Sequence, residues 1–134
     1  MKSFVLLLLA TACAFAIPSQ RDTLLSAKRE AQNAYTAAQR AKDKAQFIAA
    51  ANGFQAVGQK VAAANRALVR RIEQNGTRKV EKDHLRPLNT SIESLGNFIL
   101  PTELSPESIR SVDRYIREID QAIEAHHAAC LNIR

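Results

Sequence analysis

Cysteine is scarce in this chain of 134 residues, which has only Cys13 and Cys130. Cys13 lies in an N-terminal segment that we expect to be removed on secretion, so the mature protein cannot form an internal disulfide. Small secreted domains often rely on such crosslinks, and this one must therefore be held together by packing alone. A lone cysteine in a secreted chain either hides in the core or pairs with another chain. Cys130 is therefore a candidate for an intermolecular disulfide, most simply in a homodimer, or for a buried inert thiol.

The motifs of the common enzyme classes are also missing. The chain has only four glycines and contains no glycine-rich phosphate loop, no paired-carboxylate motif and no serine nucleophile elbow. We therefore expect a protein that is not an enzyme and that needs no cofactor.

The C-terminal stretch places His126 and Cys130 four residues apart, which would put both on one face of a helix. Two ligands do not complete a zinc site, which needs four protein ligands, or three and a water. His84 could supply a third ligand only if its helix docked against this pair. A cysteine nucleophile would also need an orienting group and oxyanion donors, which the sequence does not place. We expect neither a catalytic nor a metal site here.

Aromatic residues make up 5% of the chain, and tryptophan is absent. Proteins that bind single-stranded nucleic acid stack bases on aromatic side chains, so we do not expect a nucleic-acid partner.

Long apolar runs are absent as well. The longest begins at Phe4 and ends at Ala10, whereas a membrane-spanning helix needs about 20 apolar residues. Lys2 precedes this run, and the small residues Ala14 and Ala16 follow it, which is the pattern of a cleaved signal peptide. We therefore expect residues 1–16 to be a signal peptide, residues 17–134 to form one mature domain, and the protein to be secreted and not membrane-spanning.

Two glycosylation sequons agree with an extracellular location. They are Asn75-Gly76-Thr77 and Asn89-Thr90-Ser91. Asn75 and Asn89 are accordingly candidate glycan sites.

No alternating strand pattern is present, so the mature chain is predicted to be all-α. The first helix is expected over about 21–51, with Ser19 or Asp22 near its N-cap. Most of its apolar positions are alanine, which permits close approach of a partner helix but removes little surface from water. These positions are Leu24, Ala31, Ala38, Ala45 and Ile48.

The apolar stripe changes phase at Asn52-Gly53, which predicts a break or bend there. The second helix would then run over about 54–74 and end at Asn75 and Gly76, residues that suit a left-handed C-cap. The alternative is one long helix over 21–74 whose contact face twists.

A third helix is predicted from near Thr77 to Ile99, with Pro87 causing a kink or a fresh start. The fourth helix has the clearest start, with Ser105 at the N-cap, Pro106 at the first position and Glu107 in the first turn. Its apolar seam comprises Ile109, Val112, Ile116, Ile119, Ile123, His126, Cys130 and Ile133. Three to four helices with short connections predict a small up-and-down antiparallel bundle.

The formal net charge is +6, and basic residues gather around the end of the second predicted helix. They are Arg66, Arg70, Arg71, Arg78, Lys79, Lys82 and Arg86. Such a cluster could bind sulfated sugars or anionic lipid headgroups. The alternative is a solvated surface that balances the acidic residues of the last helix.

The functional expectation combines these features. We expect a secreted, non-enzymatic helical bundle that binds another extracellular macromolecule through a helix face. The alternative is a carrier of lipid or of a small hydrophobic ligand, in or on the bundle.

Overall fold

The computed structural model describes the backbone of residues 2–133 and the side chains of residues 21–133. This part of the chain contains helices and no strand, so the predicted all-α class is confirmed. The helices are α1 (Lys2–Arg40), α2 (Lys44–Asn75), α3 (Lys79–Lys82), α4 (Leu85–Gly96) and α5 (Pro106–Asn132). The side chains of the predicted signal peptide, residues 1–16, lie outside the described residues.

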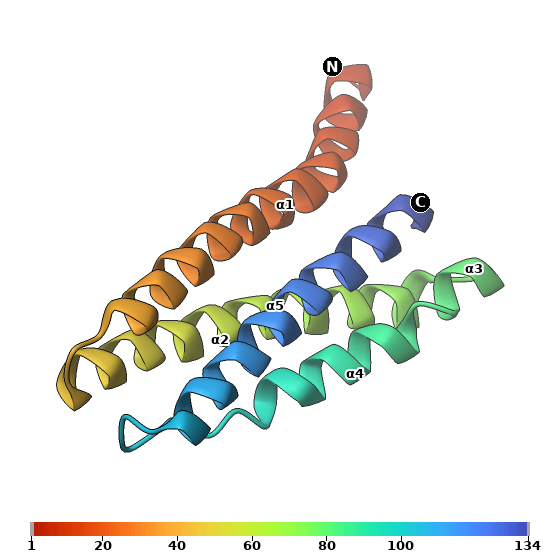
Figure 1. The fold of residues 1–134 in the computed structure, drawn as a ribbon. Helices are drawn as coiled ribbons and strands as arrows, with labels where there is room; N and C mark the ends of the chain where they lie inside the picture. The colour runs from red at the N-terminus through yellow and green to blue at the C-terminus, as the bar shows by residue number, and fades with distance from the viewer. Residues whose placement is uncertain (1, 134) are drawn as a thin grey trace.

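The long helices run back and forth along a common direction (Figure 1). α1 packs against α2 and α5, while α4 packs against α2 and α5 from another side. The short helix α3 connects α2 to α4 and also touches α5. α2 and α5 therefore share the interior of the bundle.

The break between the first two helices lies at residues 41–43 and not at Asn52-Gly53, so both predictions for residues 21–74 were wrong. Asp43 is the N-cap of α2, because its carboxylate accepts a hydrogen bond from the Gln46 backbone N–H at 2.8 Å. The Gln46 side chain in turn accepts from the Lys42 N–H at 2.9 Å. This reciprocal arrangement resembles a capping box, and it starts a new helix where the alanine-rich pattern shows no change.

The start of α1 also differs from the prediction. The helix runs through Ser19 and Asp22, so neither residue is its N-cap. Leu24, Ala31 and Ala38 are buried as expected, but Ala45 is exposed because it belongs to the first turn of α2 and not to α1.

Small residues bring α1 and α2 close together. A Cβ atom built on Gly53 would lie 3.5 Å from the Ala34 Cβ, which is ordinary van der Waals contact. The site therefore has room for an added methyl group, and close approach along the rest of the alanine-rich face stays a prediction.

The end of α2 needs glycine for a reason other than a left-handed cap. Gly76 has φ −73° and ψ 121°, which is extended backbone. A side chain at this position would press against the Ile72 carbonyl oxygen, which accepts the Gly76 N–H at 2.8 Å. The predicted left-handed C-cap was therefore wrong, and close approach to the last turn explains the glycine.

The third predicted helix starts afresh before Pro87 and does not kink at it. Asp83 and His84 separate α3 from α4, and Pro87 is the third residue of α4. A proline in the first turn loses no intrahelical hydrogen bond, because the first N–H groups have no partner within the helix.

The predicted start of the last helix is confirmed. The Ser105 hydroxyl oxygen accepts from the Ser108 N–H at 3.1 Å, and Pro106 is the first helical residue. Most of the predicted seam is buried, although Ile109 at its start is 45% exposed.

The buried side chains form two apolar clusters. The larger one joins α1, α2 and α5 to Leu95 of α4, and the smaller one contains Leu68, Val69, Ile72, Leu88 and Ala129. Asn65, Ser91 and His126 are buried at positions between the two clusters along α2, α4 and α5. A polar layer thus divides the core.

Gly58 and Gly53 make a matched pair for testing this packing. A Cβ atom at Gly58 would overlap the ring and hydroxyl of Tyr115, which stacks on Phe98 at 3.9 Å. We expect Gly58→Ala to lower the free energy of unfolding by about 2 kcal/mol through overpacking. Gly53→Ala should raise it by about 0.5–1 kcal/mol, because alanine is the better helix former and the site has room.

Urea unfolding followed by circular dichroism measures both effects. Equal effects of the two substitutions would contradict the contact between Gly58 and Tyr115.

Candidate functional site

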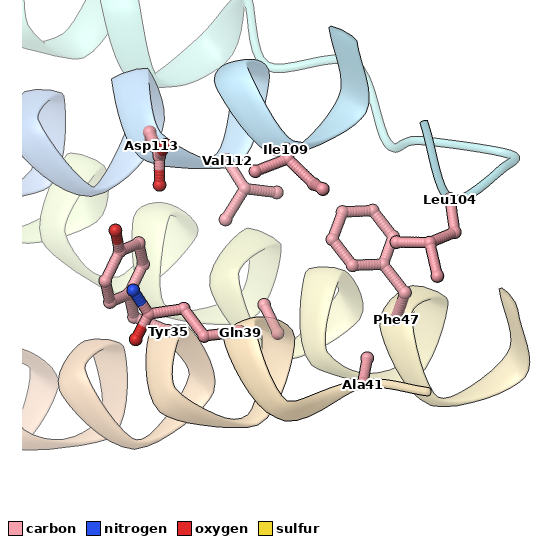
Figure 2. Close-up of a pocket in the computed structure, with 9 residues that line it drawn as sticks. Tyr35, Gln39, Ala41, Phe47, Leu104, Ile109, Val112 and Asp113 are labelled. Atoms are coloured by element: carbon pink, nitrogen blue, oxygen red, sulfur yellow. The ribbon is translucent and has the colours of Figure 1, made fainter. Parts of the chain in front are cut away.

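An apolar pocket lies at the end of the bundle where α1 turns into α2 (Figure 2). We call it the turn pocket. Its volume is about 450 Å³, which falls within the range of roughly 300–1,000 Å³ found for small-molecule sites. It is lined by Tyr35, Ala38, Gln39, Ala41, Phe47, Leu104, Ile109, Val112 and Asp113.

The pocket is hollow because large and small side chains alternate around it. Ala38 near the end of α1 and Ala41 just after it have short side chains, whereas Phe47 and Val112 are buried in the pocket wall. Ile109 is 45% exposed on α5, so part of the apolar lining faces the solvent. An apolar ligand in the pocket would remove Ile109 from water.

One side of the turn pocket is polar. Tyr35 and Gln39 extend from α1, and the Asp113 carboxylate points from α5 toward the Tyr35 hydroxyl (Figure 2). A side-chain hydrogen bond with Asp113 raises the pKa of Tyr35, and burial adds to the increase. Gln39 and Arg117 act on the pKa of Tyr35 in the opposite direction. The Tyr35 hydroxyl therefore stays protonated and faces the Asp113 carboxylate.

A second pocket of about 410 Å³ lies between α1 and the last turns of α5. We call it the histidine pocket. It is lined by Arg21, Leu25, His126, His127, Cys130 and Leu131. The sequence singled out three of these residues as a C-terminal cluster, and the structure does bring them to one cavity.

His126 belongs to the polar layer of the core. Its Nδ1 lies 2.9 Å from Asn65 Oδ1. The Asn65 amide Nδ2 donates to Ser91 Oγ at 2.8 Å and to the Ala122 carbonyl at 3.2 Å. Because an amide oxygen only accepts, His126 must carry its proton on Nδ1. His126 Nε2 is then a buried acceptor, and it has no hydrogen-bond partner.

The environment of His126 holds the ring neutral. Burial, with a smaller effect of the nearby His127, lowers the pKa of His126 from 6.5 to about 4. The hydrogen bond to Asn65 needs a proton only at Nδ1. Charging the ring would add a second N–H at Nε2, which would be buried without a partner.

His126 should therefore make stability depend on pH. Its pKa is lower in the folded than in the unfolded chain, so its contribution is complete above pH 6.5 and is lost as pH falls toward 4. A shift of this size corresponds to about 3 kcal/mol. His126→Asn keeps a donor for Asn65 but cannot titrate. We expect the wild type to lose about 3 kcal/mol more than this variant between pH 7.5 and pH 4, measured by urea unfolding.

A parallel loss of stability in the wild type and in His126→Asn would contradict the burial of a neutral His126. His127→Asn is the matched control, because it removes a half-buried histidine next to the site and should leave most of the pH dependence in place.

The third ligand that a metal site would need is not supplied by His84. The His84 Nε2 accepts a hydrogen bond from the Asn132 side chain at 2.9 Å. Within residues 21–133, no three His, Cys, Asp or Glu side chains lie close enough to hold a metal ion.

Cys130 is half-buried beside the smaller apolar cluster. Burial raises the pKa of its thiol, and Arg71 opposes this increase. A raised pKa lowers the fraction of reactive thiolate. The intermolecular disulfide therefore stays a prediction, and the geometry favours the inert thiol.

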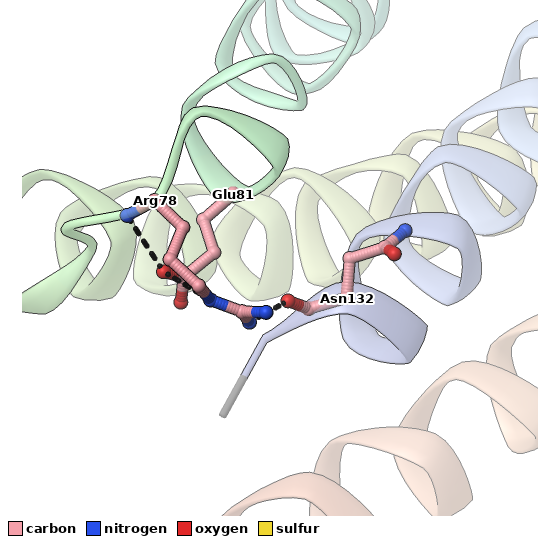
Figure 3. Close-up of polar contacts among 3 residues, drawn as sticks. All are labelled: Arg78, Glu81 and Asn132. Atoms are coloured by element: carbon pink, nitrogen blue, oxygen red, sulfur yellow. Dashed lines mark hydrogen bonds and ion pairs between the residues drawn. The ribbon is translucent and has the colours of Figure 1, made fainter.

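The predicted basic cluster is divided by the fold. Arg78 caps the end of α5 by donating to the Asn132 carbonyl, and its Nε lies 3.2 Å from the Glu81 carboxylate (Figure 3). Arg71 is half-buried near Cys130. The other five basic residues are exposed, and they are Arg66, Arg70, Lys79, Lys82 and Arg86.

Glu81 explains why Arg78 is held in place. Its carboxylate accepts the Arg78 backbone N–H at 3.1 Å. This bond, followed by the side-chain hydrogen bond and charge of Arg78, lowers the pKa of Glu81 against the opposing effect of burial. Arg78 thus serves the fold, and its part in an anion-binding patch stays a prediction.

Both sequon asparagines are exposed. Asn75 is the last residue of α2, and Asn89 lies in α4. The Ser91 hydroxyl of the second sequon is buried in the polar layer. Exposure is compatible with a glycan at each asparagine, and occupancy stays a prediction.

No helix in the described part of the chain is long and apolar enough to cross a membrane. The chain matches no protein-family model, and the searches of curated proteins and of solved structures found no match. The function must therefore be argued from the geometry alone.

Sequence reasoning missed the turn pocket. Tyr35 and Asp113 lie far apart in the sequence, and neither belongs to a recognisable motif. The one available signal was the Asp43 and Gln46 capping pair, which would have located the turn that forms one wall of the pocket.

Proposed function

We propose that this protein is a secreted, non-enzymatic helical bundle that carries a small apolar ligand in the turn pocket. The observation that carries the proposal is a preformed cavity of about 450 Å³ with mostly apolar walls and a single polar side. Small-molecule sites typically combine such walls with a few polar groups that fix the orientation of the ligand.

The exposed apolar side chains favour a ligand pocket over a helix-face docking surface. Among the described residues, the exposed large apolar side chains are Leu25, Val80, Ile99, Leu104, Ile109 and Leu131. Leu104 and Ile109 line the turn pocket, and Leu25 and Leu131 line the histidine pocket. Docking of a macromolecule through a helix face would be supported by a continuous apolar stripe along one helix. These residues are instead divided among several elements.

The proposed carrier needs no catalytic group. Tyr35 and Asp113 are the ionisable residues of the turn pocket, and the raised pKa of Tyr35 makes it a poor source of a phenolate nucleophile. Export through the signal peptide, glycans at Asn75 and Asn89, and the fate of Cys130 are further parts of the proposal, and they rest on the sequence.

Binding can be tested with an uncharged fluorescent probe, N-phenyl-1-naphthylamine, whose emission rises in an apolar site. We expect saturable binding to the wild type with a dissociation constant on the order of 100 µM, given about 0.3 kcal/mol per non-hydrogen atom. Ala41→Phe places a ring in the pocket from the α1–α2 turn and should weaken binding at least tenfold.

Ile99→Ser is the matched control, because Ile99 is 82% exposed and does not line the turn pocket. It should leave the dissociation constant within about twofold of the wild type. Circular dichroism and the urea midpoint verify that each variant is folded. Absence of saturable binding to the wild type, or equal binding by Ala41→Phe, would remove the support for this function.

The export part of the proposal has its own test. Protein secreted by a eukaryotic host should begin at Ile17 and lose mass on treatment with an N-glycosidase. Asn75→Gln and Asn89→Gln should each remove one glycan from an occupied site. N-terminal sequencing and gels with and without reductant measure these outcomes and show any dimer through Cys130. A secreted chain that still begins at Met1 would contradict the signal peptide.

A further inference from the structure

We propose that the ligand of the turn pocket is an apolar amine, whose ammonium group binds the Asp113 carboxylate while its apolar body contacts Phe47, Ile109 and Val112. This inference rests on the proposed function, because it names the chemical class of the ligand for the same pocket.

The charge of Asp113 favours a cationic ligand. Asp113 is the only residue among those lining the turn pocket that carries a formal charge at neutral pH. Its carboxylate is not paired with a lysine or arginine in the described part of the chain, where the ion pairs are Lys60 with Glu30 and Arg78 with Glu81. An unpaired carboxylate beside apolar walls attracts a cation and repels an anion.

The hydrogen-bonding groups on the polar side of the turn pocket also favour an amine. The Asp113 carboxylate faces the Tyr35 hydroxyl (Figure 2) and raises the pKa of Tyr35. A carboxylate has about four acceptor positions and no hydrogen to donate, and Tyr35 faces only part of it. The Asp113 carboxylate can therefore accept further hydrogen bonds from a ligand. An ammonium group supplies such donors, and a carboxylate ligand does not.

The surroundings of Asp113 support this choice of charge. A shallow depression next to the turn pocket is lined by Tyr35, Asp113, Arg117 and Asp120, together with Gln32 and Ile116. Arg117 is exposed and lies one turn beyond Asp113 on α5, where Asp120 offsets its charge. Asp113, Arg117 and Asp120 together carry a net charge of −1.

A matched ligand series tests the inference. 1-Naphthylmethylamine, 1-naphthalenemethanol and 1-naphthoic acid share one ring system and differ in the charge of the polar group. Displacement of N-phenyl-1-naphthylamine from the wild type should rank them amine, alcohol, acid. We expect the amine to bind about tenfold more tightly than the alcohol, which is about 1.4 kcal/mol.

Two variants with the same change in net charge distinguish a direct contact between Asp113 and the ligand from a general electrostatic effect of the protein. Asp113→Asn should abolish the preference for the amine over the alcohol. Asp120→Asn removes a carboxylate that does not line the turn pocket, and it should retain most of the preference. If Asp113→Asn does not fold, Asp113→Ser serves in its place.

The outcomes distinguish this inference from the proposed function. If all three ligands bind equally, or if Asp120→Asn and Asp113→Asn have the same effect, the assignment of an amine is wrong while an apolar pocket remains. If neither the probe nor any member of the series binds, the proposed function fails as well. Loss of amine preference in Asp113→Asn alone supports both.

Discussion

Asn65 is the residue on which the arrangement of α2, α4 and α5 depends. Its one side chain bonds to Ser91 of α4 and to both Ala122 and His126 of α5. Each of these groups is inside the bundle, so leaving any of them without a partner would cost about 1–3 kcal/mol. Apolar packing tolerates small shifts of one helix along another, whereas these bonds do not. The polar layer therefore fixes the register of three helices in a protein that has no internal disulfide in its described part.

The polar layer also determines what the two ends of the bundle can do. On one side of it, Leu68, Ile72 and Leu88 form a small compact cluster near α3. On the other side, a larger cluster extends to the turn between α1 and α2. Only this larger cluster includes the described part of α1, and the turn pocket opens at its far end.

Aromatic rings connect the core to the pocket. Tyr35 meets Phe54 edge to face at 6.4 Å, Phe54 meets Tyr115 in the same way at 6.4 Å, and Tyr115 stacks on Phe98. Gly58 makes room for this row, since any side chain there would displace Tyr115. Tyr35 at the edge of the turn pocket thus packs against Phe54, which in turn packs against Tyr115. In this position its hydroxyl faces the Asp113 carboxylate, which is the basis for assigning a donor ligand.

Alanine has two effects in this protein. At Ala34 it lies opposite Gly53 of α2, where an added Cβ would be in ordinary van der Waals contact. At the end of α1, where the helices separate at the turn, Ala38 and Ala41 are too short to fill the space that opens, and a cavity results. The same residue type thus gives tight packing or a pocket, depending on the distance between the helix backbones.

The sequence by itself determined the helical class, the cap at Ser105 and most of the buried seam of α5, because these depend on local hydrogen bonds and on the period of the helix. It did not locate the break before Asp43, since the apolar stripe changes phase at Asn52-Gly53 for packing reasons while the chain stays helical there. It also identified His126 without its partner, because Asn65 lies far away in the sequence. Only the tertiary structure decided that Tyr35 faces Asp113 and that Arg78 is occupied by Glu81 and Asn132. Such pairs depend on the register of whole helices, and in this bundle that register is set by a few buried contacts between residues far apart in the chain.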